Sequence, residues 1–501
     1  MTYTLDIHEN GIFKRTIEAT EEQTAIIDYA LANPTTNLLL EAGPGSSKTT
    51  TLRLLAKYLP IVPTCSLAFN KRIAEEMAKV LPGHYKSSTV NSLGHRGWAG
   101  TVGKRLTLDI KKNYNIVKAL IDELPRRDRM DAYEIFGDII KTLSQAKLRG
   151  YVPSEITMGK TLLTMDQFFG SLDEAPDDWF MSLVNKALMT SIKQAYAGLI
   201  DFDDQIYMSA LFGSSFPQFP RVKADEAQDF SKINQVMLEK LVGPNTQLIA
   251  VGDEFQSIYA FRGADTKSMR WLKDRFEMHA MPLSVSFRCA IEIVKNAHFR
   301  NPNLKWPTWA IEGRVEYLNE WTADSIPDNS AIICRNNAPL LSCALALLRA
   351  GRGVHLVGTD LGPQLVRALK KLGDPQMPQE KVYEAITAWE EDKLRKSRAP
   401  EAVTDKAECL RVFAGFGPTL GAAIAYCEHL FAAQGPIQLL SGHKAKGLEW
   451  DVVYHLDPHR IPSPWSKEGE ALEQEMNVKF VIETRPRKDL FFVKLENLRD
   501  D

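Results

Sequence analysis

The sequence predicts an α/β fold with two cores, each of which carries a helical insertion. Three observations lead to this prediction. Residues 37–58 read as a buried strand, a glycine-rich turn and a helix, which is how many nucleotide-binding α/β units begin. A second series of strand patterns starts near Met281, and a long helical stretch interrupts each series, at 97–195 and at 373–434. With 501 residues the chain is also too long for one ordinary core.

Because each insertion interrupts its core, the expected domains are discontinuous. We expect a first core at 1–96 plus 196–280, a helical insertion at 97–195, a second core at 281–372 plus 435–501, and a short helical insertion at 373–434.

Local signals define the elements of the first core. Alternation near the N-terminus predicts a hairpin that turns at Glu9-Asn10-Gly11. Thr20, which precedes two glutamates and a glutamine, is a typical N-cap and predicts a helix over 21–32. A buried strand at 37–42 and an apolar-periodic helix at 48–58 follow. In the second core, strands are expected at 331–334, 353–357, 437–440 and 452–456.

Composition sets broad limits. Hydrophobic residues make up 44% and charged residues 25%, which is typical of a globular protein. No apolar run is long enough to span a bilayer, and the N-terminus lacks the apolar region of a secretory signal. We therefore expect a cytoplasmic protein without a membrane partner. The compact length suggests a bacterial or viral origin.

Charge and cysteine content narrow the possible sites. The net charge of −2 means that any nucleic-acid track must be local, built from a few cations and aromatic rings. The six cysteines form no CxxC pair, so neither a zinc site nor a redox motif is indicated. Buried free thiols are the expectation.

Residues 42–49, Ala-Gly-Pro-Gly-Ser-Ser-Lys-Thr, lie between the strand and the helix, where a phosphate-binding loop belongs. Backbone N–H groups would hold phosphate oxygens, Lys48 would neutralise their charge, and the Thr49 hydroxyl would bind Mg²⁺. Ser47 stands where the usual pattern has glycine, and its Cβ lies where backbone approaches phosphate closely. A glycine/serine turn that binds nothing is the alternative.

An adjacent pair of carboxylates, Asp225 and Glu226, follows a short apolar stretch. In a P-loop ATPase an aspartate at the end of a strand holds Mg²⁺, and the next glutamate deprotonates the attacking water. Most such pairs are simply surface residues. The pair gains weight only from the motifs around it.

The most specific stretch is 247–264, QLIAVGDEFQSIYAFRGA, which resembles motif III of the UvrD/Rep-like helicases of superfamily 1. Residues 441–450, SGHKAKGLEW, resemble motif V of the same family. These two motifs and eight shorter blocks occur in the family's order over nearly the whole chain. The shorter blocks are TEEQ at 20–23, the loop at 42–49, AFNKRIAEEM at 68–77, TVNSL at 89–93, IDFDD at 200–204, DEAQD at 225–229, SFR at 286–288 and ETR at 483–485.

The resemblance implies two RecA-like P-loop domains that bind ATP and Mg²⁺. It implies catalytic roles for Lys48, Glu226 (general base), Gln256 (γ-phosphate sensor), Arg288 and Arg485. Thr49 and Asp225 would bind the metal. The nucleotide would contact Gln23, Gly43, Gly45, Ser46, Ser47, Lys48, Thr49, Thr50, Phe287 (stacking on adenine) and Glu449 (ribose).

The resemblance also implies a single-stranded DNA track, in which aromatic rings stack on bases regardless of sequence. The implied contacts are Phe69, Thr89, Asn91, Tyr259, Phe261, Arg262 and His443. Without the motifs, Phe69 and Tyr259 would read as core aromatics and the two arginines as ordinary ion-pair partners.

Several positions depart from the family pattern. Ser47 replaces glycine, Phe261 replaces tryptophan, Phe287 replaces tyrosine and Asn91 replaces histidine, while Pro486 follows the motif VI arginine. The leading prediction is an ATP-dependent DNA helicase or translocase that moves 3′→5′ on single strands in replication, recombination or repair. Single strands, duplex junctions and repair or replication proteins are its expected partners, and a monomer its expected state.

Two alternatives stay open and one is disfavoured. A nucleic-acid-binding protein whose ATPase is weakened by Ser47 is the main alternative. RNA as the substrate is also open, because no residue obviously reads a 2′-hydroxyl. An unrelated P-loop kinase is disfavoured, since QSIYAFRGA has no role there.

Overall fold

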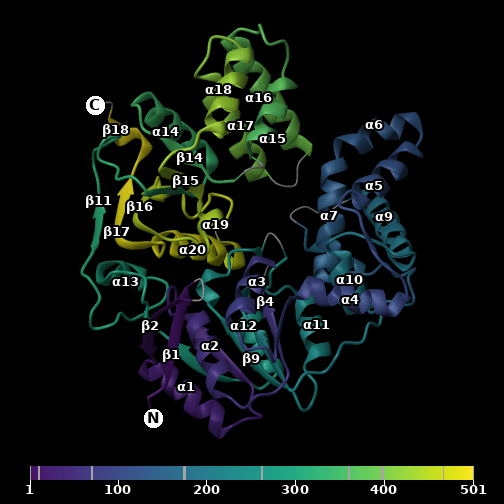
Figure 1. Ribbon diagram of the computed structural model, residues 1–501. Coiled ribbons are helices and arrows are strands. Elements are labelled where there is room, and N and C mark those ends of the chain that lie inside the picture. Colours follow the sequence, from purple (N-terminus) through teal and green to yellow (C-terminus); the bar gives the residue numbers. More distant parts are fainter. Residues whose placement is uncertain are drawn as a thin grey trace. The chain divides into compact units, whose positions relative to one another are not determined.

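The computed structural model describes residues 2–9, 12–68, 71–172, 177–260, 263–358, 361–396, 400–466 and 468–499. The chain forms two compact units, and the first of them ends at Ser284 (Figure 1). The predicted boundary between residues 280 and 281 falls inside strand β10 (His279–Leu283), which pairs with β3 (Leu38–Ala42) of the first unit. The division therefore lies four residues later than predicted, between Ser284 and Val285.

The first unit is built on a six-stranded sheet whose pairings are all parallel, in the order β10-β3-β9-β8-β4-β5. Neighbouring residues of β3 pack into different apolar clusters, Leu39 into one and Leu38 and Leu40 into the other. Successive side chains of a strand point to opposite faces, so both faces of this sheet are covered. The remaining strands are β4 (Thr64–Ala68), β5 (Tyr85–Thr89), β8 (Arg221–Ala224) and β9 (Gln247–Gly252).

Helices α1 (Glu21–Ala32) and α2 (Lys48–Tyr58) begin and end where the sequence predicts. The Thr20 side chain accepts from the backbone N–H of Gln23, which confirms the predicted cap. Strands β1 (Thr4–Glu9) and β2 (Ile12–Glu18) pair antiparallel as the predicted hairpin, although Asn10 and Gly11 of its turn lie outside the described residues. Further helices are α3 (Lys71–Val80), α11 (Lys232–Leu241) and α12 (Ser268–Arg275).

The segment after β5 is helical, as expected, and its apolar side chains join one face of the first sheet in a single cluster. Trp98 is fully buried there, and its indole N–H donates to the Ala195 carbonyl at 3.0 Å. A two-residue strand pair, β6 (Thr107–Leu108) with β7 (Leu199–Ile200), was not predicted, since two residues give no readable alternation. The helices are α4 (Val90–Val102), α5 (Lys112–Asp122), α6 (Arg126–Glu134), α7 (Phe136–Arg149), α8 (Met165–Gly170), α9 (Asp178–Tyr196) and α10 (Asp204–Leu211).

The second unit contains another six-stranded sheet with parallel pairings, in the order β11-β17-β16-β13-β15-β14. All four predicted strands are present in it. Its strands are β11 (Arg314–Tyr317), β13 (Ala331–Cys334), β14 (Val354–Leu356), β15 (Ile437–Ser441), β16 (Trp450–Leu456) and β17 (Pro486–Val493), while β12 (Trp321–Thr322) pairs with β18 (Leu498–Arg499).

A group of four helices interrupts the second unit between β14 and β15 and packs together (Figure 1). It starts at Leu361, earlier than the predicted residue 373. Its members are α15 (Leu361–Lys370), α16 (Gln379–Lys396), α17 (Pro400–Ala414) and α18 (Leu420–Ala432). The other helices of this unit are α13 (Ile291–Ala297), α14 (Asn337–Arg349), α19 (Gly442–Ala445) and α20 (Gly469–Glu483).

These two parallel sheets, each with helices and a helical insertion, confirm the predicted fold class. All six cysteines are buried and free, also as predicted. Among the described helices, none combines the length and the apolar character that crossing a bilayer requires.

Candidate functional site

The loop between β3 and α2 has the backbone conformation of a phosphate-binding turn. Gly45 and Ser47 have φ angles of 70° and 61°, in the left-handed region. The first N–H groups of α2 have no intrahelical acceptor. The Ser46 hydroxyl is buried and has no hydrogen-bond partner in the described part of the chain. Unsatisfied donors on one loop fit the triphosphate that the sequence predicts there.

Lys48, the first residue of α2, extends from this loop to Glu226. Its Nζ lies 3.0 Å from both carboxylate oxygens of Glu226. Burial lowers the pKa of Lys48, but the charges of Glu226, Asp225 and Asp253 outweigh burial, so the pKa is raised. The structure thus brings together two side chains that are 178 positions apart in the sequence. Of the neighbouring predicted ligands, Thr49 is exposed and Thr50 half-buried.

Two buried aspartates lie at or just beyond the ends of adjacent strands beside Lys48. Asp225 follows β8 and Asp253 follows β9, and burial raises the pKa of each carboxyl to about 6. The Glu226 charge adds to this rise for Asp225. Negative charge held away from water is what a cation would stabilise.

The carboxylates fit Mg²⁺ rather than a metal held only by protein. Within the described chain, no three His, Cys, Asp or Glu side chains gather in a metal-binding group. Mg²⁺ commonly takes one or two carboxylates together with phosphate oxygens and waters. Asp225 and Thr49 stay the predicted ligands, and Asp253 is a carboxylate that sequence reasoning missed.

A chain of hydrogen bonds runs from Lys48 to Gln256. The Gln228 amide donates to Glu226 Oε2 at 2.5 Å and accepts the Asp253 backbone N–H at 3.0 Å. Asp253 Oδ2 in turn accepts from Gln256 Nε2 at 2.5 Å. Gln228 and Asp253 stand inside the DEAQD and VGDEFQ blocks, so their sequence signal was present although neither received a role.

Gly252, at the end of β9, makes this chain possible. A Cβ at this position would lie 2.6 Å from Gln228 Oε1 and 2.6 Å from Met269 Sδ. Both distances are shorter than real Cβ contacts, so any larger residue would displace the amide of Gln228.

Gln23, the predicted adenine contact, is buried and engaged within the first unit. Its Oε1 accepts the Thr20 backbone N–H at 3.1 Å, and its Nε2 donates to Thr51 Oγ1 at 2.9 Å. It therefore ties the start of α1 to α2, and its contact with adenine stays a prediction.

The second unit contributes a separate group of predicted residues. Arg288 Nε lies 2.5 Å from Glu449 Oε2, and Arg487 approaches the other oxygen of Glu449 at 3.6 Å. Phe287 is half-buried, and its ring lies beside that of Trp309. Arg487 and Trp309 had no role in the sequence prediction.

Arg485, the predicted second arginine of the phosphate clamp, is almost wholly buried in the second unit. Its Nε donates to the Val481 carbonyl at 2.8 Å, and another guanidinium nitrogen lies 3.4 Å from the Leu448 carbonyl. These bonds hold the turn between α20 and β17. A role in phosphoryl transfer stays a prediction.

Two cavities lie side by side around α4, and Asn91 lines both of them. Asn91 Nδ2 donates to the Phe202 carbonyl at 3.1 Å, while Thr89 caps α4 by accepting the Ser92 N–H. The first cavity, about 530 Å³, contains Tyr259. The second, about 630 Å³, contains Thr89, Phe202 and the cations Lys71 and Arg96.

Phe202 is the aromatic residue of this surface that the sequence analysis missed. Its side chain is 54% exposed at the second cavity, although it lies in the IDFDD block. Half-buried His443 lies in α19 of the second unit. The predicted contacts Phe69, Phe261 and Arg262 lie outside the described residues.

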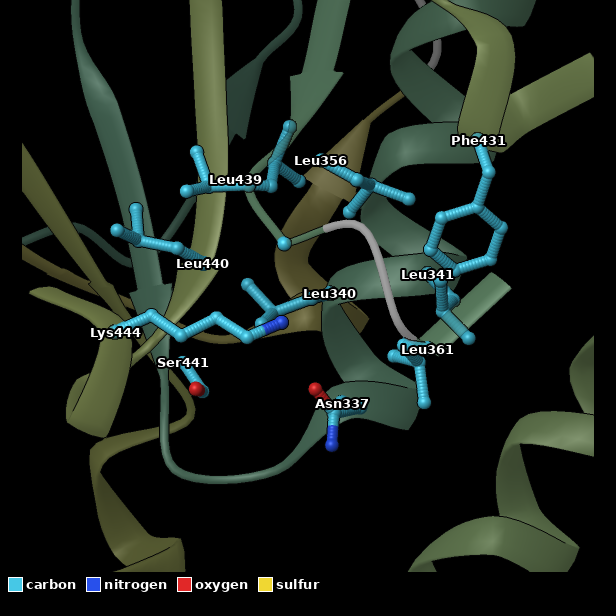
Figure 2. Close-up of a pocket in the computed structure, with 12 residues that line it drawn as sticks. Asn337, Leu340, Leu341, Leu356, Leu361, Phe431, Leu439, Leu440, Ser441 and Lys444 are labelled. Carbon is cyan, nitrogen blue, oxygen red and sulfur yellow. The ribbon is translucent and has the colours of Figure 1, made fainter. Parts of the chain in front are cut away.

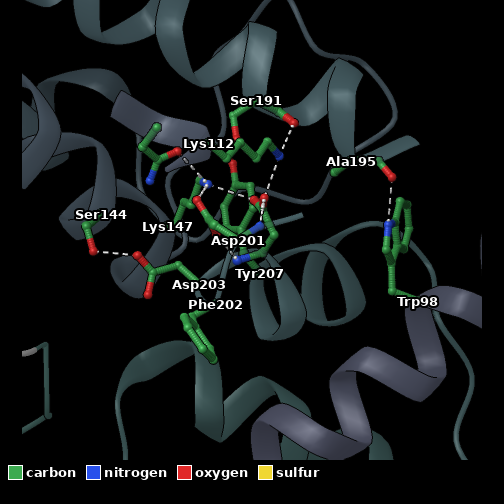
Figure 3. A network of polar contacts seen from close by, with 12 residues as sticks. Trp98, Lys112, Ser144, Lys147, Ser191, Ala195, Asp201, Phe202, Asp203 and Tyr207 are labelled. Atoms are coloured by element: carbon green, nitrogen blue, oxygen red, sulfur yellow. Dashed lines mark hydrogen bonds and ion pairs between the residues drawn. The ribbon is translucent and has the colours of Figure 1, made fainter. Parts of the chain in front are cut away.

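Behind Phe202, two buried lysines and two buried aspartates form what we call the lysine–aspartate cage (Figure 3). Lys112 Nζ lies 2.5 Å from Asp204 Oδ2, and Lys147 Nζ lies 2.6 Å from Asp201 Oδ2 and 2.8 Å from Asp204 Oδ1. Since the lysines come from α5 and α7, the cage fastens the loop that carries Phe202 to the helical insertion. Asp201 and Asp204 therefore have a structural role in this unit.

The second unit also has a small cavity beside Lys444, shown in Figure 2, where leucines from α14 and the strands face Ser441, Asn337 and Lys444. Its volume is about 10 Å³, room for one water at most. It is too small to be a ligand site.

Comparison with known proteins agrees with this arrangement. The family model described as UvrD/REP helicase N-terminal domain matches residues 20–277, and the UvrD-like helicase C-terminal domain matches residues 425–497. F-box DNA helicase protein 1 of Schizosaccharomyces pombe is 23% identical, with 94% of this chain and 57% of that protein aligned.

Two bacterial relatives are similar over shorter stretches. PcrA of Bacillus subtilis, an ATP-dependent DNA helicase, is 24% identical over 64% of this chain and 48% of its own length. DNA helicase II of Escherichia coli is 24% identical over 55% of this chain and 40% of its own length. The chain thus spans about half the length of the curated relatives that it matches. Because one family model alone covers just over half of the sequence, this chain belongs to the UvrD/REP helicase family.

Proposed function

We propose that this protein is an ATP-dependent DNA helicase or translocase that moves along single-stranded DNA. The observation that carries the proposal is the hydrogen-bonded chain from Lys48 through Glu226, Gln228 and Asp253 to Gln256. Three residues after Gln256, Tyr259 lines the cavity next to Asn91. A continuous bonded path therefore joins the predicted phosphate site to the predicted DNA surface within one unit.

Each residue of this path has a distinct chemical task. Lys48 would move from Glu226 to the phosphates, which leaves Glu226 able to accept the proton of the attacking water. Asp225 and Thr49, with Asp253 nearby, would hold a Mg²⁺ ion, which would offset the negative charge of the phosphates. Arg288 and Arg485 of the second unit would neutralise the transferred phosphoryl group. Gln256 would report the nucleotide state to the segment that carries Tyr259.

The nucleic-acid surface supports single strands as the substrate. Exposed Phe202 and half-buried Tyr259 offer ring faces to bases, while Lys71 and Arg96 offer charge to phosphates. The relatives are named as DNA helicases, which favours DNA over RNA. The family resemblance is the basis for four further parts of the proposal: movement 3′→5′, action at duplex junctions, replication or repair partners, and a monomeric state.

A binding protein with a weakened ATPase is the second candidate. Ser47 is the observation that favours it, because glycine is the usual residue at a left-handed position beside phosphate. The intact bond between Lys48 and Glu226 argues against it.

The test is ATP hydrolysis with and without single-stranded DNA. We expect DNA to stimulate hydrolysis. We expect Lys48→Ala to lower the hydrolysis rate about 10²–10³-fold, because the variant lacks a preorganised charge. Lys57→Ala, an exposed lysine on the same helix, is the matched control and should retain the rate.

Other outcomes separate the candidates. DNA binding without stimulation, with activity restored by Ser47→Gly, would support the binding protein instead. Absence of any DNA binding would refute both, and stimulation by RNA alone would change the substrate.

A further inference from the structure

Trp309 is an exposed tryptophan that lies next to the predicted adenine-stacking residue of the second unit. Its side chain is 69% exposed, and tryptophan is enriched at binding interfaces because it combines a large apolar ring with a polar N–H. The centroid of its ring lies 6.2 Å from that of Phe287, and the two ring planes differ by 32°. The two rings therefore lie beside each other, and Trp309 is the more exposed of the two.

Backbone hydrogen bonds fix the position of Trp309 relative to Phe287. The N–H of Ser286 donates to the Lys305 carbonyl at 2.8 Å, and the N–H of Ile291 donates to the Ile311 carbonyl at 2.9 Å. Between these bonds, the Ala310 N–H donates to the Pro307 carbonyl at 2.9 Å and closes a tight turn with Trp309 near its tip. These bonds hold the backbone of Trp309 close to that of Phe287, while the Trp309 side chain can still adjust the distance between the two rings.

The spacing suits a flat ligand. A base between two rings needs about 7 Å, because each stacked contact takes roughly 3.5 Å. Since the centroids are 6.2 Å apart, the ring planes differ by 32° and Trp309 is exposed, an outward shift of about 1 Å together with a rotation of the Trp309 ring would admit one.

The charged side chains around the two rings suit a nucleotide better than an uncharged aromatic ligand. Arg288, next to Phe287 in the sequence, is paired with Glu449, which Arg487 also approaches. An arginine pair can hold phosphate, and a carboxylate can accept from ribose hydroxyls.

We propose that Trp309 is the second aromatic wall of the nucleobase site, with Phe287 as the first wall. This inference rests on the proposed function, because ATP is the nucleotide that the site would take. Two stacking walls recognise the face of a base and not its edge, so both ATP and GTP should stack between them, and any preference for ATP would come from Gln23.

The experiment uses the full chain and titrates it with ATP, GTP and inorganic tripolyphosphate in the presence of Mg²⁺. We expect ATP and GTP, but not tripolyphosphate, to quench tryptophan fluorescence, and Trp309→Phe to lose most of that quenching. Trp309→Ala should raise the KM for ATP about tenfold while kcat changes little, since one stacked face is lost. Trp309→Phe should restore the KM, because it retains a ring.

Trp465→Ala is the control, because this tryptophan is 61% exposed elsewhere in the same unit. The inference is overturned if Trp309→Ala leaves the KM for ATP unchanged. Weaker oligo(dT) binding with an unchanged KM would overturn it in favour of a DNA base as the occupant. A chain that binds neither ATP nor tripolyphosphate would refute the proposed function as well, so the two failures are distinguishable.

Discussion

Ser47 is a non-glycine residue in a backbone conformation that favours glycine. Its φ of 61° and ψ of 39° lie in the left-handed region, which costs a non-glycine residue about 1–2 kcal/mol. Glycine would avoid this cost, but it would lose about 0.4–1 kcal/mol of stability because it gives the unfolded chain more freedom. The serine is thus tolerated at a position whose conformation favours glycine.

We expect Ser47→Gly to raise the free energy of unfolding by about 0.5–1 kcal/mol, which is the difference between these two effects. Urea unfolding followed by circular dichroism measures it. Ser47→Ala is the control and should give no gain, because alanine keeps the Cβ. Equal stability of the two variants would show that the loop is not strained.

At the scale of elements, the lysine–aspartate cage joins α5 and α7 to the loop before α10. Lys112 and Lys147 are fully buried, and a buried charge is stable only while its partner is present. We expect Lys147→Met to lower the free energy of unfolding by about 3–5 kcal/mol, because Asp201 and Asp204 lose a shared cation. Lys118→Met, at an exposed position of α5, should change it little. If both variants unfold at the same urea concentration, the cage does not stabilise the fold.

Asp203, in the same loop, lines the cavity of the proposed DNA surface. Burial, and next the charge of Asp201, raises the pKa of Asp203 to about 6, and its carboxylate accepts from Ser144 Oγ. Because the folded pKa is above the unfolded one, the stability from this group is full below about pH 4 and is lost as the pH rises through 6. Above pH 6 a negative charge also lines the cavity that contains Tyr259.

We therefore expect single-stranded DNA to bind several-fold more weakly at pH 7 than at pH 5.5, since like charges repel. Anisotropy of rhodamine-labelled oligo(dT) at constant salt measures this change. Asp203→Asn should remove most of the difference, whereas Asp166→Asn, at an exposed position of α8, should keep it. An unchanged pH dependence in Asp203→Asn would assign the effect to another group.

At the scale of the whole molecule, the proposed binding to a polyanion must be reconciled with a net charge of −2. We expect the affinity for oligo(dT) to fall with salt, because each phosphate contact contributes about 0.7 to the slope of log K against log salt. Lys71→Gln with Arg96→Gln should lower the slope by about 1.4, the sum of two contacts. If the double variant keeps the same salt slope, DNA does not bind at the second cavity.

The sequence by itself determined those structural elements that depend only on residues close to one another along the chain. The Thr20 cap, helix α2 and the four strands of the second sheet follow from capping chemistry and from the period of apolar residues. The motifs likewise predict roles for Lys48, Asp225 and Glu226, and folding brings Lys48 into contact with Glu226. These signals are local, so no knowledge of the rest of the chain was needed.

Tertiary structure alone decided which distant segments meet. Strand β10 joins the first sheet because its hydrogen bonds go to β3, more than 200 positions earlier, and no periodicity specifies a pairing partner. Gln228 and Asp253 form the link to Gln256 because their strands end at one edge of the sheet. The cage has the same origin: a charged lysine reads as solvated until folding places a buried carboxylate against it.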